Sequence, residues 1–159
     1  METTAILGLD MAQKTGWSLW RDGKYVASGV QDFTKRRGES NGILFLRFRK
    51  WLHDFMTEHG PFLALVYERA HMRGGPATEI GVGLQTHAQS TAEELGVLSV
   101  GVPTGTLKRF ATGAGNAGKP EMIAAAAVIT GGNPATLTDD EADAVFVGKW
   151  GCCELVPGA

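Results

Sequence analysis

The stretch that decides the fold is TAILGLDMAQKTGWSLWRDGKYVASGVQDF, residues 4–33. Residues 4–9 form a short apolar run that ends in Asp10, which is the pattern of a buried strand. Residues 17–20 and 25–33 predict two further strands, and the sequence RDGK between them is typical of a hairpin turn. The chain is therefore expected to begin with three strands, the last two of which form a hairpin.

Beyond this stretch, helical and strand patterns alternate. An amphipathic helix is expected over residues 41–59, because apolar side chains recur on one of its faces and Gly60-Pro61 ends the pattern. Continuous apolar runs predict buried strands at 62–67, directly before Glu68, and at 97–102. Further helices are expected at residues 78–95, 106–111, 121–129 and from 139 to about 150.

This order of elements predicts an α/β fold with a five-stranded mixed sheet flanked by helices. The first three strands would form an antiparallel meander, and the fourth and fifth would be added in parallel by helical crossovers. A chain of 159 residues corresponds to about one domain, so we expect a single domain over residues 1–159.

The composition excludes several classes of protein. Hydrophobic residues make up 43% of the chain and charged residues 20%, which is typical of a globular protein. The longest apolar run, residues 122–129, is far shorter than the roughly 20 residues of a membrane span, and no signal peptide is evident. Two adjacent cysteines, Cys152 and Cys153, cannot form a zinc site and favour a reduced, cytoplasmic protein.

The net charge of −2, from 15 Lys and Arg against 17 Asp and Glu, by itself argues against binding to nucleic acid. That argument weakens if several carboxylates bind metal ions. Setting aside four such carboxylates from the 17 leaves 13 acidic residues against 15 basic ones. A nearly neutral chain could then present a positive surface to phosphate.

Asp10 and Glu68 each follow an apolar run that predicts a central strand. Ligands of α/β sheets bind at the carboxyl ends of such strands. A carboxylate buried there is costly without a partner. Either acid alone could pair with an arginine or a backbone N–H, but two acids at matching strand ends favour a shared cation.

The last predicted helix begins with more acids. Thr138 and Glu141 have the spacing of a capping box, and acids in a first turn also suit the helix dipole, which accounts for Asp139 and Asp140 without any ligand role but not for Asp143. Asp140 and Asp143 are three residues apart and share a helix face. That face can meet the strand ends that carry the other two acids.

Four carboxylates without an accompanying histidine suit Mg²⁺ or Mn²⁺. Two such ions about 4 Å apart commonly catalyse phosphodiester cleavage. The four candidate ligands are Asp10, Glu68, Asp140 and Asp143.

Four segments together resemble the RuvC family of Holliday junction resolvases, which have an RNase H-like fold. They are GLDMAQKTGWSLW (8–20), VYERAHM (66–72), GTLKRFATGAGNAGKPEM (105–122) and DDEADAVFVG (139–148). The resemblance extends over residues 5–150 and implies that the four acids bind two Mg²⁺ ions, with Mn²⁺ as a substitute. It also implies functional roles for Lys108 and Lys119, the latter as a catalytic cation. The family has an aromatic wedge shortly after the second acid, whereas this chain has His71.

The function implied by the resemblance is that of a metal-dependent, structure-selective endodeoxyribonuclease that resolves Holliday junctions or other branched DNA. Its products would carry 5′-phosphate and 3′-hydroxyl ends. Symmetric resolution of a four-way junction needs two active sites, so a homodimer is expected. No small-molecule cofactor is implied.

Several residues around the acids are candidates for DNA contact. Arg69 and Arg73 flank Glu68, and His71 between them could stack on a base, contact a phosphate, shuttle a proton or be passive. The sequence GAGNAGK at 113–119 partly matches a nucleotide-binding loop, but proline follows its lysine where Ser or Thr is required. It is interpreted as a glycine-rich turn that brings Gly115 and Lys119 close to a DNA phosphate, or as a plain helix connection.

Three other functions stay open at this point. A YqgF-like RNA-processing nuclease shares the GLD start and a later Thr-Gly. An actin-like or sugar-kinase-like ATPase shares the D-x-x-x-x-T-G spacing but needs two such domains. A catalytically inactive RNase H-like scaffold is the third, and the intact set of four acids argues against it.

Overall fold

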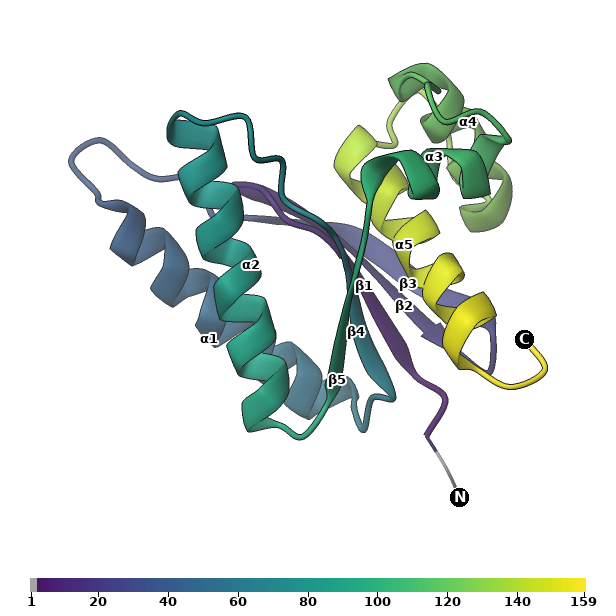
Figure 1. The fold of residues 1–159 in the computed structure, drawn as a ribbon, viewed down its shortest axis with the longest axis horizontal. Coiled ribbons are helices and arrows are strands. Elements are labelled where there is room, and N and C mark those ends of the chain that lie inside the picture. Colours follow the sequence, from purple (N-terminus) through teal and green to yellow (C-terminus); the bar gives the residue numbers. More distant parts are fainter. Residues whose placement is uncertain (1–2) are drawn as a thin grey trace.

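A computed structural model describes residues 3–159, in which one mixed sheet lies between two groups of helices (Figure 1). The strands are β1 (Ile6–Asp10), β2 (Lys14–Arg21), β3 (Lys24–Asp32), β4 (Ala64–Glu68) and β5 (Leu98–Val102). The helices are α1 (Asn41–His59), α2 (Pro76–Glu94), α3 (Thr104–Thr112), α4 (Lys119–Thr130) and α5 (Asp139–Leu155).

The order of strands in the sheet is β3-β2-β1-β4-β5, with an antiparallel meander of β1, β2 and β3. Asp22 and Gly23 both have positive φ at the turn between β2 and β3, as a type I′ hairpin requires. Strand β4 pairs in parallel with β1, and β5 pairs in parallel with β4. The predicted five-stranded fold is confirmed.

This topology places the carboxyl ends of β1 and β4 side by side in the middle of the sheet. Asp10 is the last residue of β1, and Glu68 is the last residue of β4. Two acids that are 58 positions apart in the chain are thereby brought together at the same end of the two central strands.

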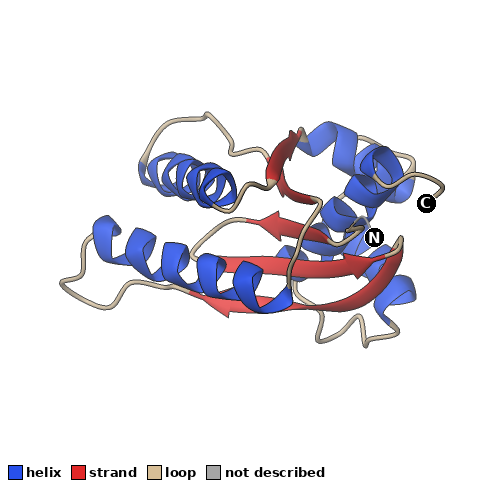
Figure 2. Ribbon diagram, turned by 90° about the horizontal axis from the view of Figure 1, so that it is seen from below, coloured by secondary structure: helices blue, strands red, loops and turns tan. Residues whose placement is uncertain are grey.

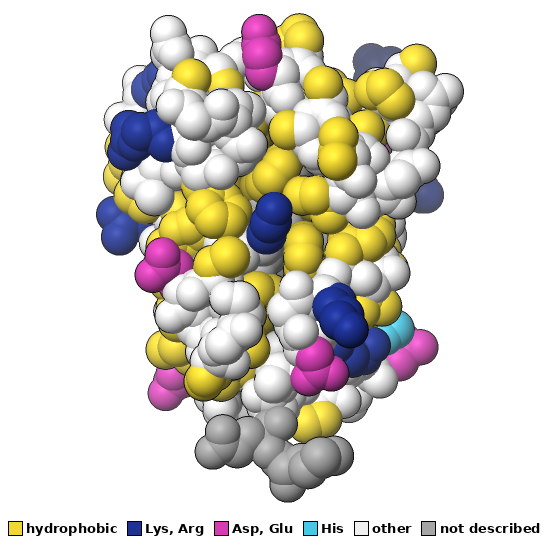
Figure 3. Space-filling model, turned by 90° about the vertical axis from the view of Figure 1, so that its right-hand side faces the viewer, with side chains coloured by type: hydrophobic (Ala, Val, Ile, Leu, Met, Phe, Trp, Pro, Cys, Tyr) yellow, Lys and Arg dark blue, Asp and Glu magenta, His cyan; other side chains and the backbone are white. Residues whose placement is uncertain are grey.

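Each face of the sheet has its own apolar core, and helices lie on both sides of the strands (Figure 2). Helices α1 and α2 pack on one face with large side chains, among which Phe48 and Leu52 are fully buried. Helix α5 packs on the other face, with α3 and α4 beside it. The side of the molecule that carries α4 exposes many apolar side chains (Figure 3), and Val128 is 86% exposed.

Several predicted boundaries differ from those of the structure, and three of them have a clear physical reason. Helix α5 continues to Leu155 instead of ending near residue 150, because Gly151 and Cys152 face the sheet and pack there. Helix α2 starts two residues early at Pro76, a residue well suited to the first turn of a helix. Strand β2 starts at Lys14, since its pairing with β3 extends that far. No helix among residues 3–159 is both long and apolar enough to cross a membrane.

Candidate active site

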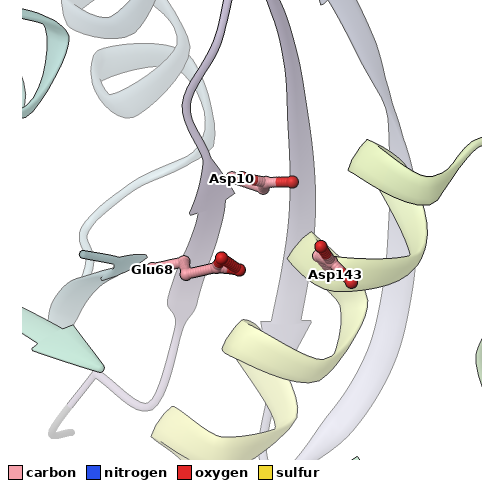
Figure 4. Close-up of side chains that lie close together, drawn as sticks. All are labelled: Asp10, Glu68 and Asp143. Atoms are coloured by element: carbon pink, nitrogen blue, oxygen red, sulfur yellow. The ribbon is translucent and has the colours of Figure 1, made fainter. Parts of the chain in front are cut away.

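Three carboxylates from three elements meet at the carboxyl ends of the central strands β1 and β4 (Figure 4). Asp10 ends β1, Glu68 ends β4, and Asp143 lies in the second turn of α5. One oxygen from each lies within 4.8 Å of the others. The arrangement is that of a site for a cation between a sheet and a helix.

The ionisation of these acids reflects their crowding. Burial raises the pKa of Asp10 well above its ordinary value, and the charges of the neighbouring carboxylates raise it further. Burial also raises the pKa of Glu68, which a hydrogen bond from Thr104 and the charge of Lys108 partly oppose. Burial and the charge of Glu68 raise the pKa of Asp143 to about 7. The cluster therefore carries more negative charge than its surroundings compensate.

Asp140 lies beside this triad. The charge of Asp140 is one of the causes that raise the pKa of Asp10, after burial and the charges of Glu68 and Asp143. Burial and the neighbouring Asp139 raise the pKa of Asp140. Asp139 itself forms an ion pair with Lys119, with 3.3 Å between Nζ and Oδ2.

The residues present fit a divalent metal. The triad offers hard carboxylate oxygens and no nitrogen or sulfur, which is the donor set that Mg²⁺ and Mn²⁺ prefer. Repulsion among the ionised carboxylates would be offset by a cation, and the raised pKa values reflect that repulsion.

Cationic side chains face the acids across a cavity of about 330 Å³. Lys108 comes from α3 and Lys119 from the first residue of α4. Thr104, one turn before Lys108 on α3, donates a hydrogen bond of 3.3 Å from its hydroxyl to Glu68. The cavity therefore has an acidic wall and a basic wall, which suits a phosphate bound through a cation.

The structure brings most of the predicted site residues into this cavity. Those that line it are Asp10, Glu68, Arg69, His71, Lys108, Lys119 and Asp143. Three predicted residues do not line it. They are Asp140 at the start of α5, Arg73, which is exposed in the segment before α2, and Gly115, which packs against the side chain of Arg109. A helix, and not a strand, precedes Gly113, so the segment at 113–118 does not have the geometry of a nucleotide-binding P-loop.

Close backbone contact fixes α5 on the sheet. A Cβ atom at Gly16 would overlap the carbonyl oxygen of Asp140, and one at Gly8 would lie 2.7 Å from the carbonyl oxygen of Ala144. The buried hydroxyl of Ser18 donates a hydrogen bond of 2.6 Å to the same Ala144 carbonyl. The segment of α5 that carries the acids is thus held directly against β1 and β2.

The start of α5 differs from the predicted capping box. Thr138 does accept a hydrogen bond from the N–H of Glu141, at 3.1 Å. The carboxylate of Glu141 does not return to Thr138, however, and instead accepts a hydrogen bond of 2.5 Å from Ser28 on β3. Glu141 therefore ties α5 to the sheet as a second anchor, because a long-range partner replaces the local one.

The sequence analysis missed Thr104 and two residues of the loop after β1, Met11 and Ala12, which also line the cavity. Thr104 could have been found, because it lies four residues before Lys108 and so shares its helix face. Met11 and Ala12 carry no chemical signal of their own. Their position follows only from the turn that connects β1 to β2.

Three of the solved structures that are similar to this chain are Holliday junction resolvases. The chain is similar to RuvC from Thermus thermophilus in complex with a Holliday junction substrate, with a TM-score of 0.75 at 18% identity over 91% of this chain and 90% of that one. A second Thermus thermophilus RuvC structure gives a TM-score of 0.73 at 18% identity, over 91% of each chain. The yeast mitochondrial Holliday junction resolvase Ydc2 gives 0.63 at 14% identity, over 91% of this chain and 75% of that one.

No protein-family model matches the sequence, and no curated protein matches it significantly. The likeness to RuvC therefore rests on three-dimensional structure and on short motifs. At this level of identity it establishes that the chain has the RuvC fold. The resemblance carried by the four sequence segments is confirmed at that level.

Proposed function

We propose that this protein is a metal-dependent endonuclease that cuts branched DNA, with the four-way junction as its principal substrate. The observation that carries the proposal is the acidic triad of Asp10, Glu68 and Asp143 facing two lysines across one cavity. The shared fold supports it, since the similar Thermus structure contains a Holliday junction substrate.

Each group at the site has a task in this proposal. The triad together with Asp140 would hold two Mg²⁺ ions, whose chemistry would be to activate a water molecule and to stabilise the leaving oxygen. Lys119 offsets negative charge that develops on the phosphate, and Lys108 holds the phosphate against the acidic wall. If water attacks the phosphorus and the bond to the 3′ oxygen breaks, the products would carry 5′-phosphate and 3′-hydroxyl ends.

Arg69, Arg73, His71 and Gly115 are proposed to contact DNA around the scissile phosphate. Arg69 and His71 line the cavity and can reach a bound strand directly. Arg73 and Gly115 lie outside it and would contact the flanking backbone. A homodimer is proposed because paired cuts across a junction need two such sites.

The test is incubation of the protein with labelled four-way junction, linear duplex, RNA and ATP, with and without Mg²⁺. Paired cuts in the junction, dependent on Mg²⁺ and much slower in duplex, are the expected result. Preferred cleavage of RNA would favour a YqgF-like enzyme, and hydrolysis of ATP alone would favour an ATPase. No turnover of any substrate with either Mg²⁺ or Mn²⁺ would favour an inactive scaffold.

A further inference from the structure

A second hollow opens beside the active-site cavity, on the side away from the two lysines. Its volume is about 290 Å³, and it lies between the loop after β1 and the start of α2. Met11 and Ala12 line both hollows, so the two form one continuous surface. A strand bound at the acids can therefore pass directly into the second hollow.

The walls of this hollow differ in character from those of the active site. Its apolar wall consists of Met11 and Ala12 from the loop and Ala77 and Ile80 from α2. Among residues 3–159, no carboxylate lines this hollow, whereas four line the neighbouring cavity. Such a wall suits a flat, weakly polar group and not a metal ion or a free phosphate.

Polar groups stand at the rim of the hollow. Lys14 is exposed at the start of β2, and its charge acts on Asp140 and on Asp32, which is its partner across the β2–β3 pair. The side-chain oxygen of Gln13 accepts a hydrogen bond of 3.3 Å from the N–H of Lys35. That bond orients the amide and leaves its NH₂ group to donate to a ligand. These groups match a single nucleotide. The cation suits its phosphate, the amide donor suits the edge of its base, and the apolar wall suits the face of the base.

We infer that this hollow binds one unpaired nucleobase of the DNA strand that is cleaved at the acids. The inference rests on the proposed nuclease function and adds a selection rule to it. In duplex DNA the faces of the bases are covered by their neighbours, so an apolar wall can contact a face only after the base leaves the stack. A branch point supplies such a base at low cost, and a continuous duplex does not.

The test compares tryptophan substitutions at two neighbouring residues in the first turn of α2, exposed Ala77 and half-buried Thr78. Ala77→Trp fills the hollow, whereas Thr78→Trp adds the same ring one residue away, at a position that does not line it. Junction cleavage by Ala77→Trp should be at least about fivefold slower than by wild type, the low end of what contact with one base contributes. Thr78→Trp should cut within twofold of wild type.

The substrate provides a matching arm of the test. The cut is first mapped with wild type, and an abasic spacer then replaces each nucleotide next to the cut phosphate in turn. At one position the spacer should slow wild type as much as Ala77→Trp does, and should slow Ala77→Trp no further. Equal rates for Ala77→Trp and Thr78→Trp, or equal rates on every spacer substrate, would overturn the inference while leaving the proposed function intact.

A binding measurement covers the case in which Ala77→Trp does not fold. The fluorescent base 2-aminopurine, placed at the position identified with the spacers, should brighten when wild type binds the junction in EDTA, because the base leaves its stack. An unchanged signal with bound protein would contradict the inference. If wild type cuts no junction at all, the proposed function fails and the inference fails with it.

Discussion

The two faces of the sheet are packed in different ways, and the difference separates function from stability. On one face, α1 fills space with large side chains such as Phe48, Leu52 and Phe55. On the other, α5 approaches so closely that Gly8 and Gly16 have no room for a side chain. Large side chains can repack after a substitution, whereas backbone in contact with backbone cannot. The acids of the site are carried by the face that cannot adjust.

The largest effect is expected from Gly16→Ala. The added methyl group would overlap the carbonyl of Asp140, so α5 must move away from β2 together with its acids. A displacement of this kind is expected to slow junction cleavage about 100-fold. Gly42→Ala is the matched control, since its Cβ would meet nothing closer than the Ser40 hydroxyl at 3.4 Å. Equal cleavage by the two variants would show that the position of α5 is not critical.

Ser18→Ala tests the hydrogen bond that anchors α5. The variant leaves the buried carbonyl of Ala144 without its partner on β2, which costs about 1–3 kcal/mol of unfolding free energy. Because Ala144 adjoins Asp143, cleavage should fall as well, by roughly tenfold, through a smaller shift of the same helix. Denaturant unfolding and single-turnover cleavage measure the two effects. A loss of stability with full cleavage activity would assign Ser18 to the core alone.

Leu52→Ala probes the opposite face. This side chain is fully buried under α1, and its truncation is expected to cost about 2–5 kcal/mol of unfolding free energy. The cleavage rate, measured at a temperature well below the melting temperature of the variant, should stay within about twofold of wild type. The reason is that α1 contributes no residue to the active-site cavity. A large loss of cleavage by the folded variant would show that the two faces are coupled.

The smallest expected effect is a change in the melting temperature of wild type with pH. The pKa of Asp143 is raised in the folded protein from 3.8 to about 7, so the folded state binds a proton more tightly than the unfolded state does. Without metal, stability should therefore be highest near pH 4 and decline as the pH rises to about 7, by a few degrees in melting temperature.

Saturating Mg²⁺ should reverse this decline, because it binds only the folded, deprotonated site. Asp143→Asn should reduce the decline in EDTA, and the raised pKa values of Asp10, Glu68 and Asp140 should account for what is left. A wild-type melting temperature that rises steadily from pH 4 to pH 7 in EDTA would contradict the raised pKa values of the clustered acids.

Much of the fold was predictable because hydrophobic periodicity determines the strands and helices locally. The meeting of Asp10 and Glu68 was also predictable, since both end strands that belong at the centre of such a sheet. The hydrogen bond from Ser28 to Glu141 was not, because it joins residues 113 positions apart and the local capping pattern pointed elsewhere. The hollow beside Met11 could not be predicted from the sequence for a similar reason, because its wall comes from two distant segments without a shared motif.

The central claim is that the acidic triad cuts DNA, and Asp10→Asn tests it most directly. The substitution keeps the shape of the side chain and removes a charge from the cluster, so the fold should survive and junction binding should persist or tighten. Single-turnover cleavage of a labelled four-way junction in Mg²⁺ should fall below a few per cent of the wild-type rate, which corresponds to a loss of at least about 2 kcal/mol in transition-state stabilisation. Cleavage at more than a few per cent of wild type by the folded variant would contradict the claim.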